Sequence, residues 1–139
     1  MAFDQIQHIA GGDIYPSRFV KLSTAADYTL LQAGANERVF GVATNATKDA
    51  PLSGASSLAA AATYPVATNP VGSIALVEVG SGGITRGDMV KSDSNGKAVT
   101  AASTGTTVQW IGGEALESAA AGEFAKILVV NYPFRPALS

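Results

Sequence analysis

Short runs of apolar residues, separated by turn-forming residues, recur along the chain and predict a series of strands. Runs of about four to eight residues rich in β-branched and aromatic residues, bounded by Gly, Pro, Asn, Asp or Ser, are typical of strands. The runs of this kind are 14–22, 28–31, 38–44, 73–79, 89–92, 97–100, 108–111 and 125–130. Only 58–62 has helical propensity, for a single turn that Pro65 ends. The pattern predicts a mainly β protein with little helix, folded as a compact antiparallel β-barrel or β-sandwich.

Two features of the second half of the chain sharpen this expectation. Asn95-Gly96 lies between the runs 89–92 and 97–100. This dipeptide favours a β-hairpin with a type I′ turn, because that turn needs positive φ at both central residues. Gly112-Gly113 directly follows the run 108–111, and glycine in a strand marks a bulge or a close backbone approach. The second half therefore reads as a compact set of antiparallel strands.

The sequence also contains a weak internal echo. The segment from 18–21 through 39–43 resembles the segment from 88–91 through 110–115. Each reads as strand, turn and strand, with a glycine after two apolar residues. Such an echo predicts two similar β units that pack together, because each is too small to bury its own apolar face.

The ends of the chain carry apolar and aromatic residues outside the predicted core. We divide the chain into an N-terminal arm (1–13), one β domain (14–131) with a long loop at about 45–70, and a C-terminal tail (132–139). A frayed terminus and a plain surface tail are the alternatives. Large apolar side chains in a tail favour docking on a partner surface. The candidate contact residues are Phe3, Ile6, Ile9, Tyr132, Phe134 and Arg135.

Composition narrows the class of protein. Of the 139 residues, 47% are hydrophobic and 14% are charged, which is unlike a disordered chain. The formal net charge of −2 gives no basic surface for nucleic acid or an anionic membrane. The N-terminal residues lack the basic and apolar regions of a signal peptide. With no cysteine in the chain, disulfides, thiolate chemistry and cysteine metal sites are excluded.

Few residues suggest chemistry. The chain has one histidine, His8, which lies in the predicted arm, whereas a catalytic base must be held in a fixed pocket. Asp93-Ser94-Asn95-Gly96 starts like a calcium loop but lacks the later ligands, and Gly80-Ser81-Gly82-Gly83 lacks the Gly-Lys-Ser/Thr of a phosphate loop. We therefore expect no catalytic, cofactor-binding or metal-binding residues. Glu114 and Glu117, as a carboxylate pair of a small β-barrel hydrolase, are the enzymatic alternative.

The second half of the chain resembles the capsid cement, or head decoration, proteins of tailed bacteriophages. The resemblance depends on the order and spacing of five segments. They are Val77-Glu78-Val79-Gly80, the run from Gly83 to Asp93, Asn95 to Val99, Ile111 to Glu117, and Ala119 to Glu123 followed by an apolar strand. Gly113 departs from it, since a larger apolar residue is expected before Ala115-Leu116-Glu117. The loop at 45–70 and both tails lie outside the resemblance.

The resemblance implies a small β-tulip-like structural protein rather than an enzyme. It would be made in the host bacterial cytoplasm and bind the outer surface of an icosahedral head. There it would sit as a homotrimer and clamp neighbouring major capsid subunits, with no cofactor and no nucleic-acid or membrane partner. The alternative is a phage-surface module that binds a carbohydrate or the host surface, for which Tyr64, Trp110 and Tyr132 are the stacking candidates.

Overall fold

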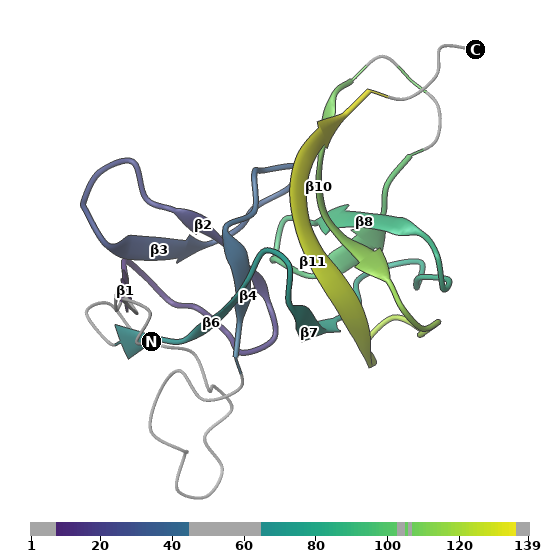
Figure 1. Ribbon diagram of the computed structural model, residues 1–139, viewed down its shortest axis with the longest axis horizontal. Helices are drawn as coiled ribbons and strands as arrows, with labels where there is room; N and C mark the ends of the chain where they lie inside the picture. The colour runs from purple at the N-terminus through teal and green to yellow at the C-terminus, as the bar shows by residue number, and fades with distance from the viewer. Residues whose placement is uncertain (1–7, 45–64, 103–104, 106, 136–139) are drawn as a thin grey trace, which may run out of the picture.

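The computed structural model describes residues 8–44, 65–102, 105 and 107–135, and these residues form strands and turns without a helix. Two sheets lie side by side (Figure 1). The mainly β prediction is confirmed. Among the described residues there is no helix of the length and hydrophobicity that crossing a membrane requires. The predicted helical turn at 58–62 and residues 45–64 of the loop predicted at about 45–70 lie outside the described residues. Residues 65–70 of that loop are not irregular but form two short strands.

The first sheet has six strands in the order β5-β1-β3-β2-β4-β6. Its strands are β1 (His8–Ala10), β2 (Phe19–Leu22), β3 (Thr29–Gln32), β4 (Gly41–Ala43), β5 (Pro65–Val66) and β6 (Thr68–Pro70). Only Ala67 separates β5 from β6, so the two ends of the sheet order are one continuous segment. The sheet therefore closes on itself, and we call residues 8–44 and 65–70 the first unit. Its β1–β3 pair is parallel, whereas the sequence predicted antiparallel pairs only.

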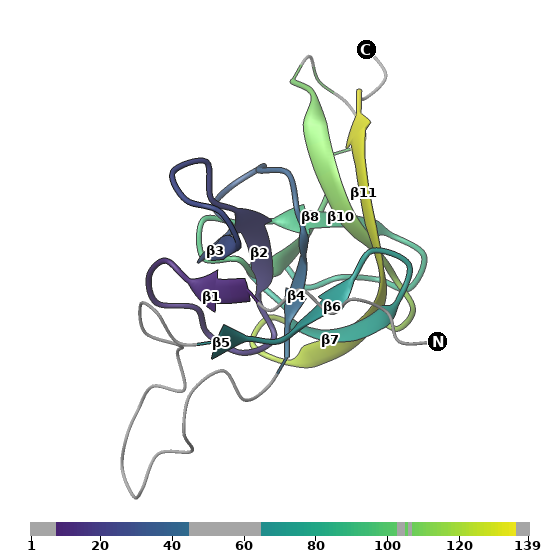
Figure 2. The same cartoon turned by 60° about the vertical axis from the view of Figure 1, so that its left-hand side comes forward.

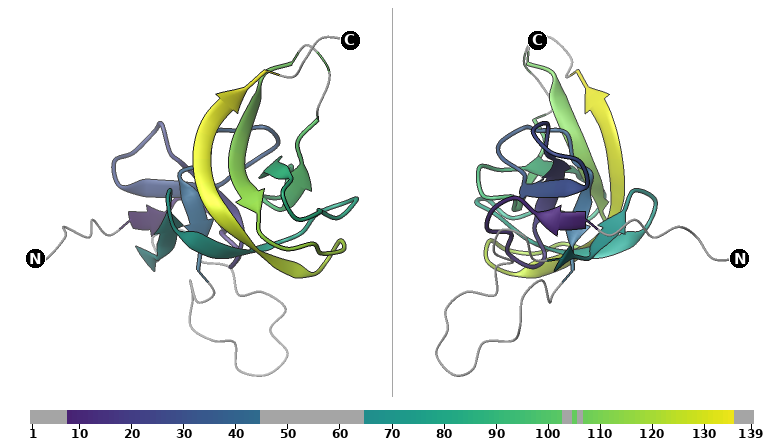
Figure 3. Two further views of the ribbon diagram at one scale, coloured as in Figure 1. Left: turned by 45° about the vertical axis from the view of Figure 1, so that its right-hand side comes forward. Right: turned by 90° about the vertical axis from the view of Figure 1, so that its left-hand side faces the viewer.

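The second sheet has five strands in the order β7-β11-β10-β8-β9. Its strands are β7 (Ile74–Glu78), β8 (Met89–Ser92), β9 (Ala98–Thr100), β10 (Gln109–Ala115) and β11 (Phe124–Phe134). A parallel bridge from Val79 to Ala98 links the end of β7 to β9, the opposite edge of the sheet. The second sheet therefore also curls, around the long bowed strand β11 (Figure 3, left). We call residues 74–134 the second unit.

The two units repeat one architecture, as the internal echo predicted. In the first unit β2 pairs with β3 and with β4, and in the second β8 pairs in the same way with β9 and with β10. The registers of these pairs correspond. The register pairs are Val20 with Gly41 and Phe19 with Val42 in the first unit, and Val90 with Gly113 and Met89 with Glu114 in the second. Each unit enters this strand through a residue of positive φ, Ser17 (59°) or Gly87 (92°). The prediction of two similar units is confirmed.

Backbone hydrogen bonds repeat with the registers. The N–H of Ser17 donates to Ala43 as that of Gly87 donates to Ala115. The N–H of Thr44 donates to Ala67 as that of Leu116 donates to Lys126. Six core residues of the first unit, Ala10, Ile14, Val20, Leu30, Ala43 and Val66, have as counterparts Val79, Ile84, Val90, Ala98, Ala115 and Ala125, all buried. The equivalence therefore extends to the side chains inside each unit.

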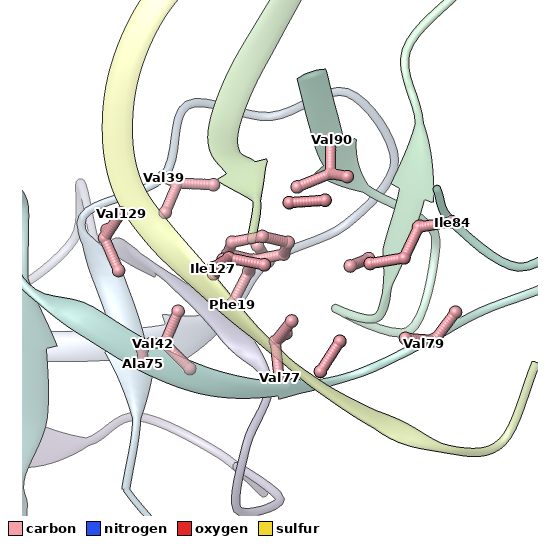
Figure 4. Close-up of a cluster of buried hydrophobic side chains, with 14 residues drawn as sticks. Phe19, Val39, Val42, Ala75, Val77, Val79, Ile84, Val90, Ile127 and Val129 are labelled. Carbon is pink, nitrogen blue, oxygen red and sulfur yellow. The ribbon is translucent and has the colours of Figure 1, made fainter. Parts of the chain in front are cut away.

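The two units pack together around an aromatic residue of the first unit. Phe19 is fully buried beside Ile127 and Val39 (Figure 4), in a cluster that joins Ala33, Val39 and Val42 of the first unit to the core of the second. It lies over Gly112, where an added Cβ would come within 2.9 Å of the Phe19 ring. Because Gly112 has no side chain, the Phe19 ring can pack directly against its backbone, which is the kind of close approach expected at Gly112-Gly113. The register also shifts between Ile111 and Gly113, which confirms the bulge.

The hairpin at Asn95-Gly96 is present, but its turn is not type I′. Gly96 has a φ of 76° whereas Asn95 is not among the described residues with positive φ, so the expected turn type was wrong. The Oδ1 atom of Asp93 accepts hydrogen bonds from the N–H groups of Asn95 (2.7 Å) and Lys97 (2.9 Å). This carboxylate braces a longer turn between Ser92 and Ala98, which pair in the sheet. The aspartate considered for calcium has a structural role.

Candidate contact surface

The predicted contact residues that the structure describes lie in two separate places. Ile9 is 39% exposed in β1 of the first unit, so this part of the predicted arm is a strand of the sheet. Tyr132 and Phe134 belong to the end of β11, and Arg135 follows them. The two places are well separated in the fold (Figures 1 and 2). Phe3 and Ile6 lie outside the described residues.

The C-terminal candidates belong to a two-stranded ribbon. Here β10 pairs with β11 through Gln109 with Phe134, Trp110 with Pro133 and Ile111 with Tyr132. This stretch lies beyond the point where β8 pairs with β10, so the ribbon projects from the second unit (Figure 1). The bulge at its base bends it, since bulges increase local twist and redirect side chains. We call residues 108–111 and 131–135 the ribbon end.

A loop of the first unit holds one side of the ribbon end. The guanidinium of Arg38 lies 5.5 Å from the centre of the Trp110 ring, within range of a cation–π interaction. Its Nε donates to Oδ1 of Asn131 at 3.3 Å. The side chain of Asn36 accepts from the N–H of Trp110 and donates to the carbonyl of Val108, both at 2.9 Å. This side is therefore aromatic, basic and ordered by its contacts.

The other side of the ribbon end carries Tyr132, which is 40% exposed. Its hydroxyl lies 3.2 Å from Sδ of Met89. Because Tyr132 pairs with Ile111 while Trp110 pairs with Pro133, the two aromatic residues point to opposite faces of the ribbon. They do not form one stacking platform for a sugar ring. Tyr64, the third stacking candidate, lies outside the described residues.

A second exposed apolar surface, which the sequence analysis missed, covers the outer face of β7 and β11. Ile74 is 61% exposed, and Leu76, Leu116 and Phe124 are also exposed. Ile74 pairs with Leu128, so their side chains share the outer face. The run 73–79 is almost continuously apolar, a pattern typical of a strand buried on both sides. Ala75, Val77 and Val79 of this run are buried while Ile74 and Leu76 are exposed, so only the structure reveals this surface.

The described residues hold no arrangement that suggests catalysis or metal binding. No group of three His, Cys, Asp or Glu residues in this part of the chain is placed to hold a metal ion. Glu114 is exposed on β10, and Oε2 of Glu117 accepts a hydrogen bond from the N–H of Lys126 at 2.9 Å. A depression of about 630 Å³ has one ionisable residue in its lining, Glu123, whose carboxylate accepts from the N–H of Ala120.

A charged cluster joins the two units. Oε1 of Glu78 lies 3.1 Å from Arg18 of the first unit, and Oε2 lies 3.2 Å from Lys97. Burial acts to raise the pKa of Glu78, but its hydrogen bond with Lys97 and the charge of Arg18 outweigh burial and hold this pKa below its usual value. Arg18 also donates to the carbonyl of Asn95 at 2.8 Å. The cluster therefore fixes the first unit to the hairpin turn of the second.

Comparison with known proteins gives an informative likeness of fold. No family model matches this sequence, and no curated protein matches it. The fold is similar to that of the N base of head fiber gp8.5 in bacteriophage phi29, with a TM-score of 0.63 and 20% sequence identity. The similarity covers 88% of this chain and 90% of that chain. It shows that both units together, rather than one of them, form the shared fold.

Proposed function

We propose that this chain is a structural protein of a tailed-phage virion, bound to the outer surface of the head. The observation that carries the proposal is the fold similarity to the phi29 head fiber base, which spans nearly the whole of both chains. That protein is, by its name, part of a phage head. The sequence resemblance to capsid cement proteins, which depends on residues 77–123 and the following strand, supports the same assignment independently.

The finer form of the proposal is decoration. Copies of the chain, assembled as trimers, would clamp neighbouring major capsid subunits and stabilise the shell. The exposed apolar face of β7 and β11 and the aromatic, basic ribbon end are surfaces of the kind that protein–protein contacts use. Each Å² of apolar surface buried in such a contact contributes about 25 cal/mol, less the cost of ordering. Repetition over a symmetric shell multiplies modest contacts through avidity.

The test is co-sedimentation of the purified chain with heads of its phage that lack it. Gel densitometry against the major capsid protein gives the bound ratio at increasing protein concentration. We expect saturation at a fixed ratio to the major capsid protein. A chain that stays in the supernatant at all concentrations contradicts the proposal and favours a host-surface role.

Truncation then tests the predicted arm. Deletion of residues 1–7 removes Phe3 and Ile6 and keeps β1, which begins at His8. We expect this variant to keep its melting temperature and to bind heads more weakly. Deletion through Gly11 is a poorer test, because it also removes a strand that pairs with both β3 and β5. Head binding by the 1–7 deletion that equals wild type would rule out the arm as an anchor.

A further inference from the structure

The ribbon end projects from the fold with both of its strand edges closed to a further strand. The N–H of Trp110 and the carbonyl of Val108 point away from β11, because both bond to the side chain of Asn36. This amide takes the place of a neighbouring strand on the β10 edge. Trp110 and Pro133 therefore form a non-hydrogen-bonded pair, so the backbone of Pro133 faces the outer edge of β11, where proline has no N–H to donate. Recognition by the ribbon end thus depends on its side chains.

The side chain of Arg38 is held in place by two contacts at the ribbon end. Its guanidinium lies 5.5 Å from the centre of the Trp110 ring, and its Nε donates to Oδ1 of Asn131 at 3.3 Å. These contacts use one face of the guanidinium and its Nε. The two Nη groups make no hydrogen bond with the described residues, and Arg38 is exposed. A pair of Nη groups is a planar fork that matches the two oxygens of a carboxylate.

The carboxylates close to Arg38 in the fold are already engaged. Glu37 precedes it in the chain, but Oε2 of Glu37 accepts from Nζ of Lys21 and Oε1 accepts from the N–H of Gly34, both at 2.6 Å. Asp93 lies on the hairpin that this loop contacts, and its Oδ1 braces the turn. The guanidinium of Arg38 is therefore positioned without a carboxylate partner among the described residues.

Two further basic side chains lie at or beside the ribbon end. Arg135 follows β11 and is exposed, and it forms no ion pair with the described residues. Lys91 donates its Nζ to Oε1 of Gln109 at 2.7 Å. The ribbon end is thus a basic surface on a chain whose formal net charge is −2, and the ligand that it fits carries negative charge.

The form of this surface favours a carboxylate on a protein over other anionic or polar ligands. A nucleic acid or other phosphate polymer is bound by a groove of many cations along its backbone, whereas this surface has two free arginines beside a tryptophan. A sugar ring stacks on an open aromatic face, and Arg38 covers one face of Trp110. Tryptophan, tyrosine and arginine are the residues that contribute most to protein–protein contacts. The ribbon end presents all three.

We propose that the ribbon end is the surface that contacts the head, and that the two Nη groups of Arg38 bind a carboxylate of an acidic segment on the major capsid protein. Trp110 and Asn131 are positioning residues, because they orient the guanidinium before the partner arrives. Binding then orders little that is not already ordered, which favours affinity. The inference rests on the proposed function and names both the contact surface and the chemistry of the partner.

The experiment is co-sedimentation of full-length variants with heads that lack the chain. Arg38→Ala should bind at least tenfold more weakly than wild type and keep its melting temperature, because Arg38 is exposed. Arg38→Lys should recover little of the loss, since lysine keeps the charge but not the planar fork. Arg86→Ala is the matched control, because Arg86 is an exposed arginine in the turn beside Ser118, and it should bind as wild type does.

A double-variant cycle tests the positioning role of Asn131. Asn131→Ala alone should weaken head binding by a smaller factor than Arg38→Ala, because the guanidinium is still present but no longer held through its Nε. In the Arg38→Ala background the same change should have no further effect. Equal effects of Asn131→Ala in the two backgrounds would contradict its action through Arg38.

A carbodiimide identifies the partner group, because this reagent condenses an amine with a carboxylate that contacts it. At a saturating concentration of Arg38→Lys on heads, peptide mass spectrometry should find position 38 joined to an aspartate or glutamate of the major capsid protein, whereas wild type reacts only through its native lysines. A position 38 that does not react, or an Arg38→Ala variant that binds as wild type does, would overturn the inference and leave head binding intact. Wild type that never sediments with heads would instead overturn the proposed function, and this contact with it.

Discussion

The two units of this protein share strand registers and turn geometry, yet they fill their interiors in different ways. In the first unit, the ring of Phe40 packs against the unit's own core and lies 5.0 Å from the ring of His8. In the second unit, the equivalent of Phe40 is Gly112, and the ring over it is Phe19 of the first unit. The core of the first unit is thus covered by its own residue Phe40, whereas the core of the second is completed by Phe19, which belongs to the first unit.

Two interior positions of the second unit carry smaller residues than their counterparts in the first. Ala98 stands where the first unit has Leu30, and Ala125 stands where it has Val66. Close packing does not tolerate a void of this size without cost. The second unit therefore depends on the first for its core, which explains why the chain buries one shared cluster across both units and a smaller one in the first alone. The two units are therefore similar in architecture and different in how their cores are completed.

The largest effect expected from this difference follows Phe19→Ala. The side chain is fully buried between the units, and truncation of a buried phenylalanine typically costs about 3–5 kcal/mol. We expect a loss of about 4 kcal/mol in the free energy of unfolding, measured by urea denaturation. Because the ring fills the second unit, amide hydrogen exchange should rise most in β8, β10 and β11. A uniform rise across both units would contradict the assignment of the ring to the second unit.

An aromatic side chain placed at Gly112 should make the core of the second unit independent of Phe19. Gly112→Phe alone should destabilise the protein, since even a Cβ there would lie 2.9 Å from the Phe19 ring and overpacking typically costs about 1–3 kcal/mol. Combined with Phe19→Ala, it copies the arrangement that Phe40 has in the first unit. We expect the double variant to be at least about 1 kcal/mol more stable than the sum of the single changes predicts. Simple additivity would refute the equivalence of the two positions.

A smaller effect is expected from Phe40→Ala, the counterpart in the first unit. Phe40 is only partly buried against the first unit's core, so the cost should be about 2 kcal/mol, below that of a fully buried ring. Urea denaturation of the two alanine variants, side by side, gives the comparison. Hydrogen exchange should rise in β1 and β3 and stay unchanged in β11. A loss equal to that of Phe19→Ala would show that both units depend on their aromatic residue equally.

Local sequence signals predicted most of the strands and the repeat, because both depend on residue patterns within short segments. They missed β1, β5 and β6, which lie in the segments assigned to the arm and to the long loop. The runs 28–31, 73–79 and 89–92 lie within a residue or so of β3, β7 and β8. The echo between 39–43 and 110–115 aligned Gly41 with Gly112, the glycine that follows two apolar residues, whereas the registers make Gly113 the equivalent of Gly41. The turn at Asn95 was mispredicted because the carboxylate of Asp93 accepts two backbone N–H groups there, a competing interaction that the dipeptide rule ignores.

The contact surfaces were less predictable, for a physical reason. Which side of an apolar strand faces solvent depends on how the second sheet curls, and no local pattern encodes this. Ile74 and Leu76 looked like core residues, whereas the small Ala75 between them is the buried one. Residues 132–134, which the sequence assigned to a C-terminal tail, belong to β11 and pair with β10. The repeat adds a comparison at two positions of this face, since the first unit has Thr44 and Asn69 where the second has Leu116 and Leu128.

The smallest effect expected concerns the ion pairs that join the units, which the repeat does not preserve. Glu78 has Ile9 as its equivalent, and Arg18 has Asp88. Because the pKa of Glu78 is lowered in the folded protein, its contribution to stability is full above about pH 4.5 and is lost as pH falls through the lowered value.

Glu78→Gln should cost about 1 kcal/mol at pH 7 and leave stability less sensitive to acid between about pH 5 and pH 3. Glu114→Gln is the control, since Glu114 forms no ion pair with the described residues. Thermal unfolding of both variants across this pH range measures the difference, and parallel pH profiles for Glu78→Gln and wild type would show that the charged cluster does not stabilise the contact between the units.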